Sequence, residues 1–181
     1  MPAELPSLVD RGLRLARVDF HPKTPAHRQP SGLRVVAALA LSVAGSLAVD
    51  ALLVALGEAV FPSTKGFGHF QFSDYGKLTV IGVVVAGLAW PVVTRISPAP
   101  RWLFFRLAIA VTLVLWLPDL YILYRGEPAR AVAVLMVMHL AIALITYNCL
   151  VHIAPVRALA PARSRAGTPG ADPDRFARRG S

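Results

Sequence analysis

Four ionisable side chains stand inside or at the edge of long apolar stretches of the sequence. They are Asp50, Glu58, Asp119 and His139. An ionisable group surrounded by lipid is costly unless it faces a partner or water. Because carboxylates and imidazoles can share hydrogen bonds, exchange protons or bind a cation, these four residues are the first candidates for chemistry.

The sequence leaves three interpretations of Asp50, Asp119 and His139 open. As a structural clamp, the three side chains would share hydrogen bonds and hold three helices in register. As a proton or cation site, they would exchange protons near neutral pH. As a metal site, two carboxylates and one histidine would form a facial set of ligands, although no sequence spacing supports it.

The composition indicates which kind of element carries these residues. The chain has 181 residues, of which 55% are hydrophobic and only 16% are charged, whereas soluble domains have about 25% charged residues. The mean hydropathy is +0.56. This balance argues against a soluble enzyme. The single cysteine, Cys149, excludes an internal disulfide framework.

Four segments are long and apolar enough to cross a membrane as helices, because a span needs about 20 apolar residues. Open strands are excluded, since their unpaired edges cannot face lipid. We therefore predict an all-α, four-helix transmembrane bundle. The breaks contain proline, as at Pro62, Pro98, Pro128 and Pro155. The predicted helices cover residues 35–60, 78–96, 103–124 and 131–154.

Residue counts place the three candidate groups at a similar depth. Asp50 lies 15 residues into the first segment, about 22 Å along a helix, and Asp119 lies 16 residues into the third, about 24 Å along. His139 lies eight residues into the fourth segment, about 12 Å from the opposite face. In an apolar layer about 30 Å thick, all three fall in the same half.

Positive charge predicts the orientation of the bundle. The sequence divides into a basic arm (residues 1–33), a transmembrane domain (34–155) and a basic tail (156–181), which we expect to be disordered. Fifteen of the 19 lysines and arginines fall on the side shared by the two termini and the second connection. The positive-inside rule therefore places both termini in the cytoplasm.

The basic arm contains a possible amphipathic helix at residues 7–20. Arg11, Arg14 and Arg17 recur at intervals of three, opposite an apolar stripe. We expect such a helix to contact anionic lipid headgroups, although a loosely ordered segment fits equally well. Nucleic acid is not an expected partner, because no reader motif is present and aromatic residues are not interleaved with the arginines.

Small residues on one ridge of the first segment predict close helix packing. The ridge carries Asp50 at its end, and the second segment offers a small pair at a similar depth, Gly82 and Ala86. We expect the ridge to face the bundle interior and to bring Asp50 with it. Its small residues are Ala38, Ser42 and Ser46, and Gly45 lies beside them.

Aromatic residues gather in the first outer connection, residues 62–77. This cluster is typical of an interfacial belt, and a lid over the bundle is the alternative. Trp90 is interpreted in the same way, as an interface anchor.

No catalytic signature is present, so we do not expect an enzyme. No cofactor or metal is expected either. Haem ligated by two histidines would need a second histidine opposite His139, and His69 lies in the outer connection.

Two short runs carry a family resemblance: Gly82 to Trp90 in the second segment, and Val134 to Leu140, which includes His139, in the fourth. With these runs the chain resembles a family of small four-helix integral membrane proteins of unknown function from high-GC actinobacteria. The resemblance covers residues 35–155. It implies a multi-pass protein of the bacterial plasma membrane and no particular activity.

We expect a non-enzymatic integral membrane protein that acts as an accessory or interaction subunit. Its partners would be anionic lipids and another membrane protein or further copies of itself. The alternative is a proton-coupled small transporter or ion-conducting bundle that uses Asp50, Asp119 and His139, with Glu58 as an outer gate.

Overall fold

The computed structural model describes Gly12, Leu15 and residues 27–158. This part of the chain forms four long helices: α2 (Gly32–Val60), α3 (Phe72–Ile96), α4 (Pro100–Tyr124) and α5 (Ala129–Ile153). Each helix is long and apolar enough to cross a membrane. The predicted all-α, four-helix bundle is therefore confirmed for the described residues.

The main difference from the predicted boundaries is at the start of α3. This helix begins six residues before the predicted position, because Phe72–Lys77 is too polar to be recognised by hydropathy but is helical. Asp74 lies in the first turn, where a carboxylate favours the helix dipole. The connection before α3 is correspondingly shorter and contains two short 3₁₀ helices, η1 (Pro62–Thr64) and η2 (Gly68–Phe70).

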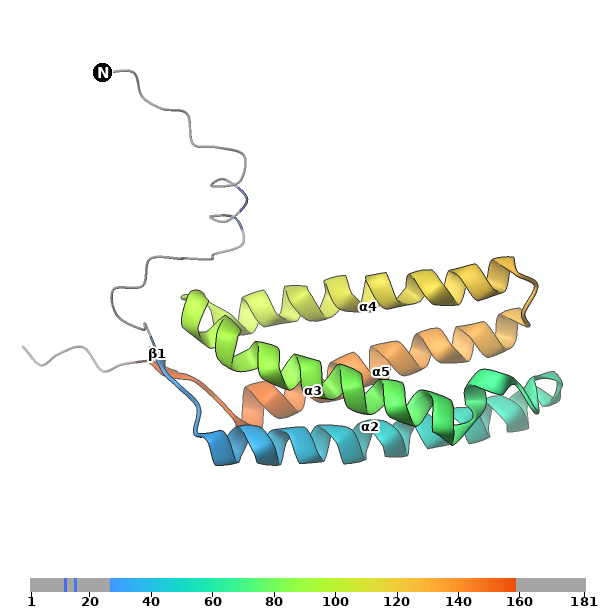
Figure 1. The fold of residues 1–181 in the computed structure, drawn as a ribbon, viewed down its shortest axis with the longest axis horizontal. Coiled ribbons are helices and arrows are strands. Elements are labelled where there is room, and N and C mark those ends of the chain that lie inside the picture. Colours follow the sequence, from blue (N-terminus) through green and yellow to red (C-terminus); the bar gives the residue numbers. More distant parts are fainter. Residues whose placement is uncertain (1–11, 13–14, 16–26, 159–181) are drawn as a thin grey trace, which may run out of the picture.

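The four helices run antiparallel in chain order (Figure 1). The most extensive interface joins α2 and α5, while α4 packs on α5 and α3 packs on α2. Helices α3 and α4 contact one another much less, and in Figure 1 they diverge from their shared connection. We call the end where α2 begins and α5 finishes the termini end, and the opposite end the far end.

Two short strands join the segments that flank the bundle. β1 (His27–Arg28) pairs antiparallel with β2 (Arg157–Ala158), with His27 opposite Ala158. The described chain therefore enters and leaves the bundle at the same end, as an even number of spanning helices requires.

The α4–α5 turn closes the far end with a glycine in the left-handed region. Gly126 has φ of +98°, a conformation that glycine adopts without steric cost. Its N–H donates to the carbonyl of Leu123, and the N–H of Glu127 donates to that of Ile122. This Schellman motif ends α4, and Pro128, two residues later, is the N-cap of α5.

Apolar side chains form two separate clusters along the bundle. The termini-end cluster is centred on Trp90, Phe104 and Leu150, which are all buried. The far-end cluster is centred on Phe70, Leu135 and Met138. The middle of the bundle lies between these two clusters.

Part of the sequence-based interpretation falls outside the described residues. The side chains of Arg11, Arg14 and Arg17, the proposed helix at residues 7–20 as a whole and the tail from residue 159 onward belong to this part. The contacts predicted for the two basic arms therefore stay predictions.

Candidate functional site

Asp50 is the most deeply buried ionisable side chain of the described bundle, with no exposed surface. It lies on α2, and its Oδ2 accepts a hydrogen bond of 2.7 Å from the hydroxyl of Thr79 on α3. This bond links two adjacent helices in their apolar middle. The second carboxylate oxygen, Oδ1, is buried without a hydrogen-bond partner.

Asp119 on α4 lies against His139 on α5. Its Oδ2 is 3.0 Å from Nδ1 of the imidazole, which is close enough for an ion pair. Apart from this contact, neither of the two atoms has a hydrogen-bond partner. The carboxylate side chain is 7% exposed and the imidazole is 25% exposed, so access to this pair is through the histidine.

The contacts between α2 and α5 show that the two pairs lie at one level. A Cβ at Gly45 would meet Ile145 at 3.4 Å, and a Cβ at Gly57 would meet Val134 at 3.1 Å. Asp50 lies between these two glycines, so it is level with about residue 140 of α5, next to His139. Consistent with this position, His139 is near enough to act on Asp50 electrostatically.

Each of the four helices thus contributes one side chain to a shared layer. We call Asp50, Thr79, Asp119 and His139 the polar layer. Two groups nearer the far end interact electrostatically with this layer. Tyr75 interacts with Asp50, and His69 interacts with Asp119.

Unpartnered polar atoms concentrate in and beside the polar layer. Among the described residues, six buried side-chain atoms have no hydrogen-bond partner, and three of them belong to Asp50, Asp119 and His139. Two more belong to Ser46, one turn from Asp50, and Thr146, two turns from His139. Because Asp119 and His139 lie against each other as an ion pair, Oδ1 of Asp50 is the atom of this group in the polar layer that has neither a hydrogen bond nor an ion-pair partner, which makes it the candidate position for a proton or an ion.

The fourth predicted residue, Glu58, stands apart from this layer. It is partly buried on α2, two turns beyond Asp50, and within the described part of the chain it makes no hydrogen bond or ion pair. Among the same residues, no three His, Cys, Asp or Glu side chains lie together in a way that could hold a metal ion.

The small-residue ridge of α2 lies inside the bundle. Ala38, Ser42 and Ser46 are fully buried, as is Asp50 at the end of the ridge. Ser42 donates a 2.8 Å hydrogen bond to the carbonyl of Ala38 in its own helix. Gly45 allows Ile145 of α5 to approach α2 closely.

The packing role predicted for the second segment falls on a different glycine. Gly82 is exposed, and a Cβ added there would meet nothing within 4 Å, so it does not serve helix packing within this chain. Gly87 does so instead, because a Cβ there would collide with the side chain of Leu39 on α2. Ala86 is half-buried against the termini-end cluster.

Two further residues have roles that the sequence did not reveal. Thr79 belongs to the polar layer. The only feature of the sequence that could have indicated this is that Thr79 is the first polar residue of an otherwise apolar segment. Trp90 was interpreted as an interface anchor, but it is fully buried and its Nε1 donates a 3.0 Å hydrogen bond to the carbonyl of Ala154, where α5 ends. Trp90 is therefore a core residue, whose indole N–H pairs with a carbonyl that the end of α5 leaves without a partner within the helix.

The aromatic residues of the first outer connection divide between interior and surface. Phe70 is buried in the far-end cluster, with Phe67 and Tyr75 packed against it. Phe72 is 63% exposed. Neither a purely interfacial belt nor a detached lid describes this arrangement, because part of the connection belongs to the core.

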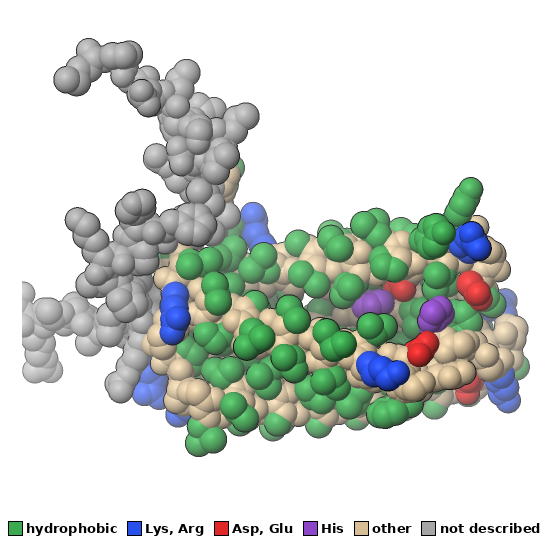
Figure 2. Space-filling view, viewed as in Figure 1, with side chains coloured by type: hydrophobic (Ala, Val, Ile, Leu, Met, Phe, Trp, Pro, Cys, Tyr) green, Lys and Arg blue, Asp and Glu red, His purple; other side chains and the backbone are tan. Residues whose placement is uncertain are grey.

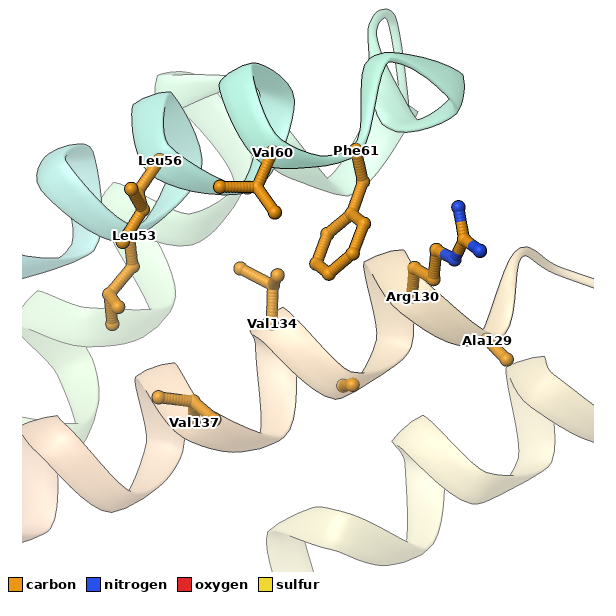
Figure 3. Close-up of a pocket in the computed structure, with 10 residues that line it drawn as sticks. Leu53, Leu56, Val60, Phe61, Ala129, Arg130, Val134 and Val137 are labelled. Atoms are coloured by element: carbon orange, nitrogen blue, oxygen red, sulfur yellow. The ribbon is translucent and has the colours of Figure 1, made fainter.

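An apolar groove of about 470 Å³ lies between α2 and α5 near the far end (Figure 3). Leu53, Val60, Val134 and Val137 line it, and Arg130 is its one charged residue, with its guanidinium 5.2 Å from the ring of Phe61. Because the groove contains no carboxylate or imidazole, it offers no acid–base chemistry. Its surface suits lipid acyl chains.

Comparison of the chain with family models, curated proteins and solved structures found no match. The resemblance to the actinobacterial membrane family therefore stays a prediction.

Proposed function

We propose that this chain is a proton-coupled transporter or ion-conducting bundle, in which the polar layer binds and releases a proton or a small monovalent cation. The observation that carries the proposal is the carboxylate of Asp50, which is fully buried in the apolar middle of the bundle with one oxygen unpartnered. A proton or cation at that oxygen would remove the cost of burying an unpartnered charge.

A purely structural clamp is less well supported by the same contacts. A structural clamp stabilises a fold most when every polar atom in its hydrogen-bond network has a partner. Here Thr79 satisfies one oxygen of Asp50 and His139 pairs with Asp119, while the other oxygen of Asp50 is buried without a partner. The layer therefore has spare capacity to accept protons or a cation.

The two apolar clusters favour a carrier over an open pore. Trp90, Phe104 and Leu150 close the bundle between the polar layer and the termini end. Phe70 and Leu135 pack on the far-end side of the layer. Exchange with both sides of the membrane then requires helix movement, because neither cluster provides a polar route.

Proton flux in liposomes tests this function. We expect Asp50→Asn to reduce proton uptake, driven by a potassium diffusion potential and followed with an internal pH dye, to the level of protein-free liposomes. Asparagine keeps an acceptor for Thr79 but cannot exchange a proton. The matched control is Ser42→Ala on the same ridge, which removes only a hydrogen bond within α2.

Two results would contradict the proposal. One is flux through the Asp50→Asn protein equal to that of the wild type. The other is the absence of any flux above protein-free liposomes with correctly folded wild-type protein.

An accessory or interaction subunit is the second candidate, favoured by the exposure of α4. This span is the least covered of the four, with only 11% of its most apolar window buried. If the accessory role is correct, pull-down after mild extraction recovers a larger membrane complex. A solitary chain under the same conditions would speak against it.

We further propose that the bundle lies in the bacterial plasma membrane with both termini in the cytoplasm. The support is the excess of lysine and arginine on the termini side. The arginines of the basic arm would then contact the anionic inner leaflet.

A further inference from the structure

The bundle has a hollow on the side where α3 and α4 diverge. Figure 2 shows this hollow on the face between α4 and α3, with histidine and acidic side chains gathered at it. Contact between α3 and α4 is sparse compared with the α2–α5 interface. Since each of these helices contains an apolar window long enough to cross a membrane, the hollow faces the region that lipid tails would occupy.

The exposed fractions show which part of the polar layer is accessible. The imidazole of His139 is 25% exposed and its partner Asp119 is 7% exposed, whereas Asp50 has no exposed surface. A ligand that arrives from outside therefore meets the Asp119–His139 pair first. Asp50 is closed off from the surface.

Toward the far end, a second pair stands near the same site. Nδ1 of His69 is 3.7 Å from Asp74, and both side chains are about half exposed. His69 is also near enough to act on Asp119 electrostatically. The groups that face the polar layer are thus Asp50 from α2, Tyr75 from α3, Asp119 from α4, His139 from α5 and His69 from η2.

The charges of the polar layer are unbalanced. It contains two carboxylates, Asp50 and Asp119, and one imidazole, His139. With both carboxylates ionised and the imidazole protonated, the layer has one excess negative charge, and the neighbouring His69 does not cancel it because His69 is paired with Asp74. A monovalent cation would neutralise it, and an apolar body on that cation would suit the lipid-facing walls of the hollow.

We propose that a lipophilic monovalent organic cation enters from the bilayer between α3 and α4 and binds against Asp119. This inference rests on the proposed function and names the class of substrate that the polar layer would exchange. The cation's charge lies at the Asp119–His139 pair, and its apolar part remains in the hollow. Binding and proton occupancy of the layer then compete for the same negative charge.

Equilibrium binding of tetraphenylphosphonium to the purified full-length protein in nanodiscs tests the inference. We expect saturable binding to the wild type and an affinity at least about tenfold lower for Asp119→Asn. Asp119→Glu keeps the charge and restores binding. His139→Gln removes the group that competes with the cation for Asp119 and strengthens binding, an opposite sign that a merely structural role for the pair would not produce.

Two controls separate charge recognition from apolar partition. Tetraphenylborate has the same shape and the opposite charge, and we expect no saturable binding of it. Glu127→Gln removes a carboxylate in the exposed α4–α5 turn, away from the layer, and binding should equal that of the wild type.

The inference is overturned if the wild type does not bind tetraphenylphosphonium, if it binds tetraphenylborate equally well, or if Asp119→Asn binds like the wild type. Proton flux measured on the same preparations distinguishes failure of this inference from failure of the proposed function. Flux that persists without cation binding overturns only the substrate class. If the folded wild-type protein shows neither proton flux nor cation binding, the proposed function is overturned as well.

Discussion

The two carboxylate oxygens of Asp50 have different environments. Oδ2 accepts the hydroxyl of Thr79, and Oδ1 has no partner although the side chain is fully buried. This difference is what makes the residue a candidate for proton or cation binding. Thr79 therefore has a positioning role, since it fixes the orientation of the carboxylate.

At this scale we predict that Thr79→Val destabilises the protein by about 1 kcal/mol, because it leaves a buried carboxylate without its donor. Valine has nearly the same shape, so packing changes little. Thermal unfolding in detergent measures the effect, and Thr79→Ser should recover most of the loss.

Thr112→Val is the matched control for this prediction, because the hydroxyl of Thr112 bonds only to the carbonyl of Ala108 in its own helix. Equal destabilisation by the two substitutions would show that the Thr79–Asp50 bond has no special role.

Sequence patterns could identify some of these residues and not others. Asp50, Asp119 and His139 stand out because ionisable residues are rare inside apolar segments. Thr79 does not, because a threonine in an apolar helix is common and usually bonds within its own helix, as Thr112 does. Which hydroxyl crosses to another helix depends on helix rotation, and a single sequence does not encode that in any short pattern.

At the scale of helices, the close approach of α2 and α3 depends on the absence of a side chain. A Cβ at Gly87 would collide with Leu39 of α2. The same approach brings Thr79, two turns nearer the start of α3, to Asp50. Helix spacing at Gly87 and the geometry of the polar layer are therefore linked.

We predict that Gly87→Ala destabilises the bundle by about 1 to 3 kcal/mol through overpacking. Leu39→Ala in the same chain should relieve the collision, and a double-mutant cycle of thermal unfolding measures the coupling between the two sites. Gly82→Ala is the control, since a Cβ there meets nothing within 4 Å. Additive effects of the Gly87 and Leu39 substitutions would contradict this account.

The helix boundaries show where hydropathy succeeds and where it is insufficient. The ends at Val60, Ile96 and Tyr124 coincide with the predicted ends, because proline or glycine follows each of them closely. The start of α3 was missed, because its first turns carry polar and aromatic residues that extend the helix beyond its apolar span.

At the scale of the whole molecule, the described chain enters and leaves the bundle at one end, where β1 and β2 pair. The orientation of that end relative to the membrane is a proposal that rests on arginine and lysine counts. Chemical labelling from one side of the membrane can test it directly.

In a Cys149→Ser background, which removes the only native thiol, we introduce Ser63→Cys at the far end and Ser31→Cys at the termini end. Both positions are exposed. A membrane-impermeant maleimide added to intact cells should label Ser63→Cys and should reach Ser31→Cys only after permeabilisation. The reverse pattern would invert the proposed topology.

The amino-acid sequence alone determined the number of helices, their approximate ends and the identity of the isolated ionisable residues. It could do so because hydropathy, proline positions and buried charge are properties of single segments. Only the tertiary structure decided that Asp50 pairs with Thr79 and Asp119 with His139, and that α3 and α4 diverge over this layer. These features depend on helix rotation and spacing, which are set by side chains that lie far apart in the chain, such as Gly87 against Leu39.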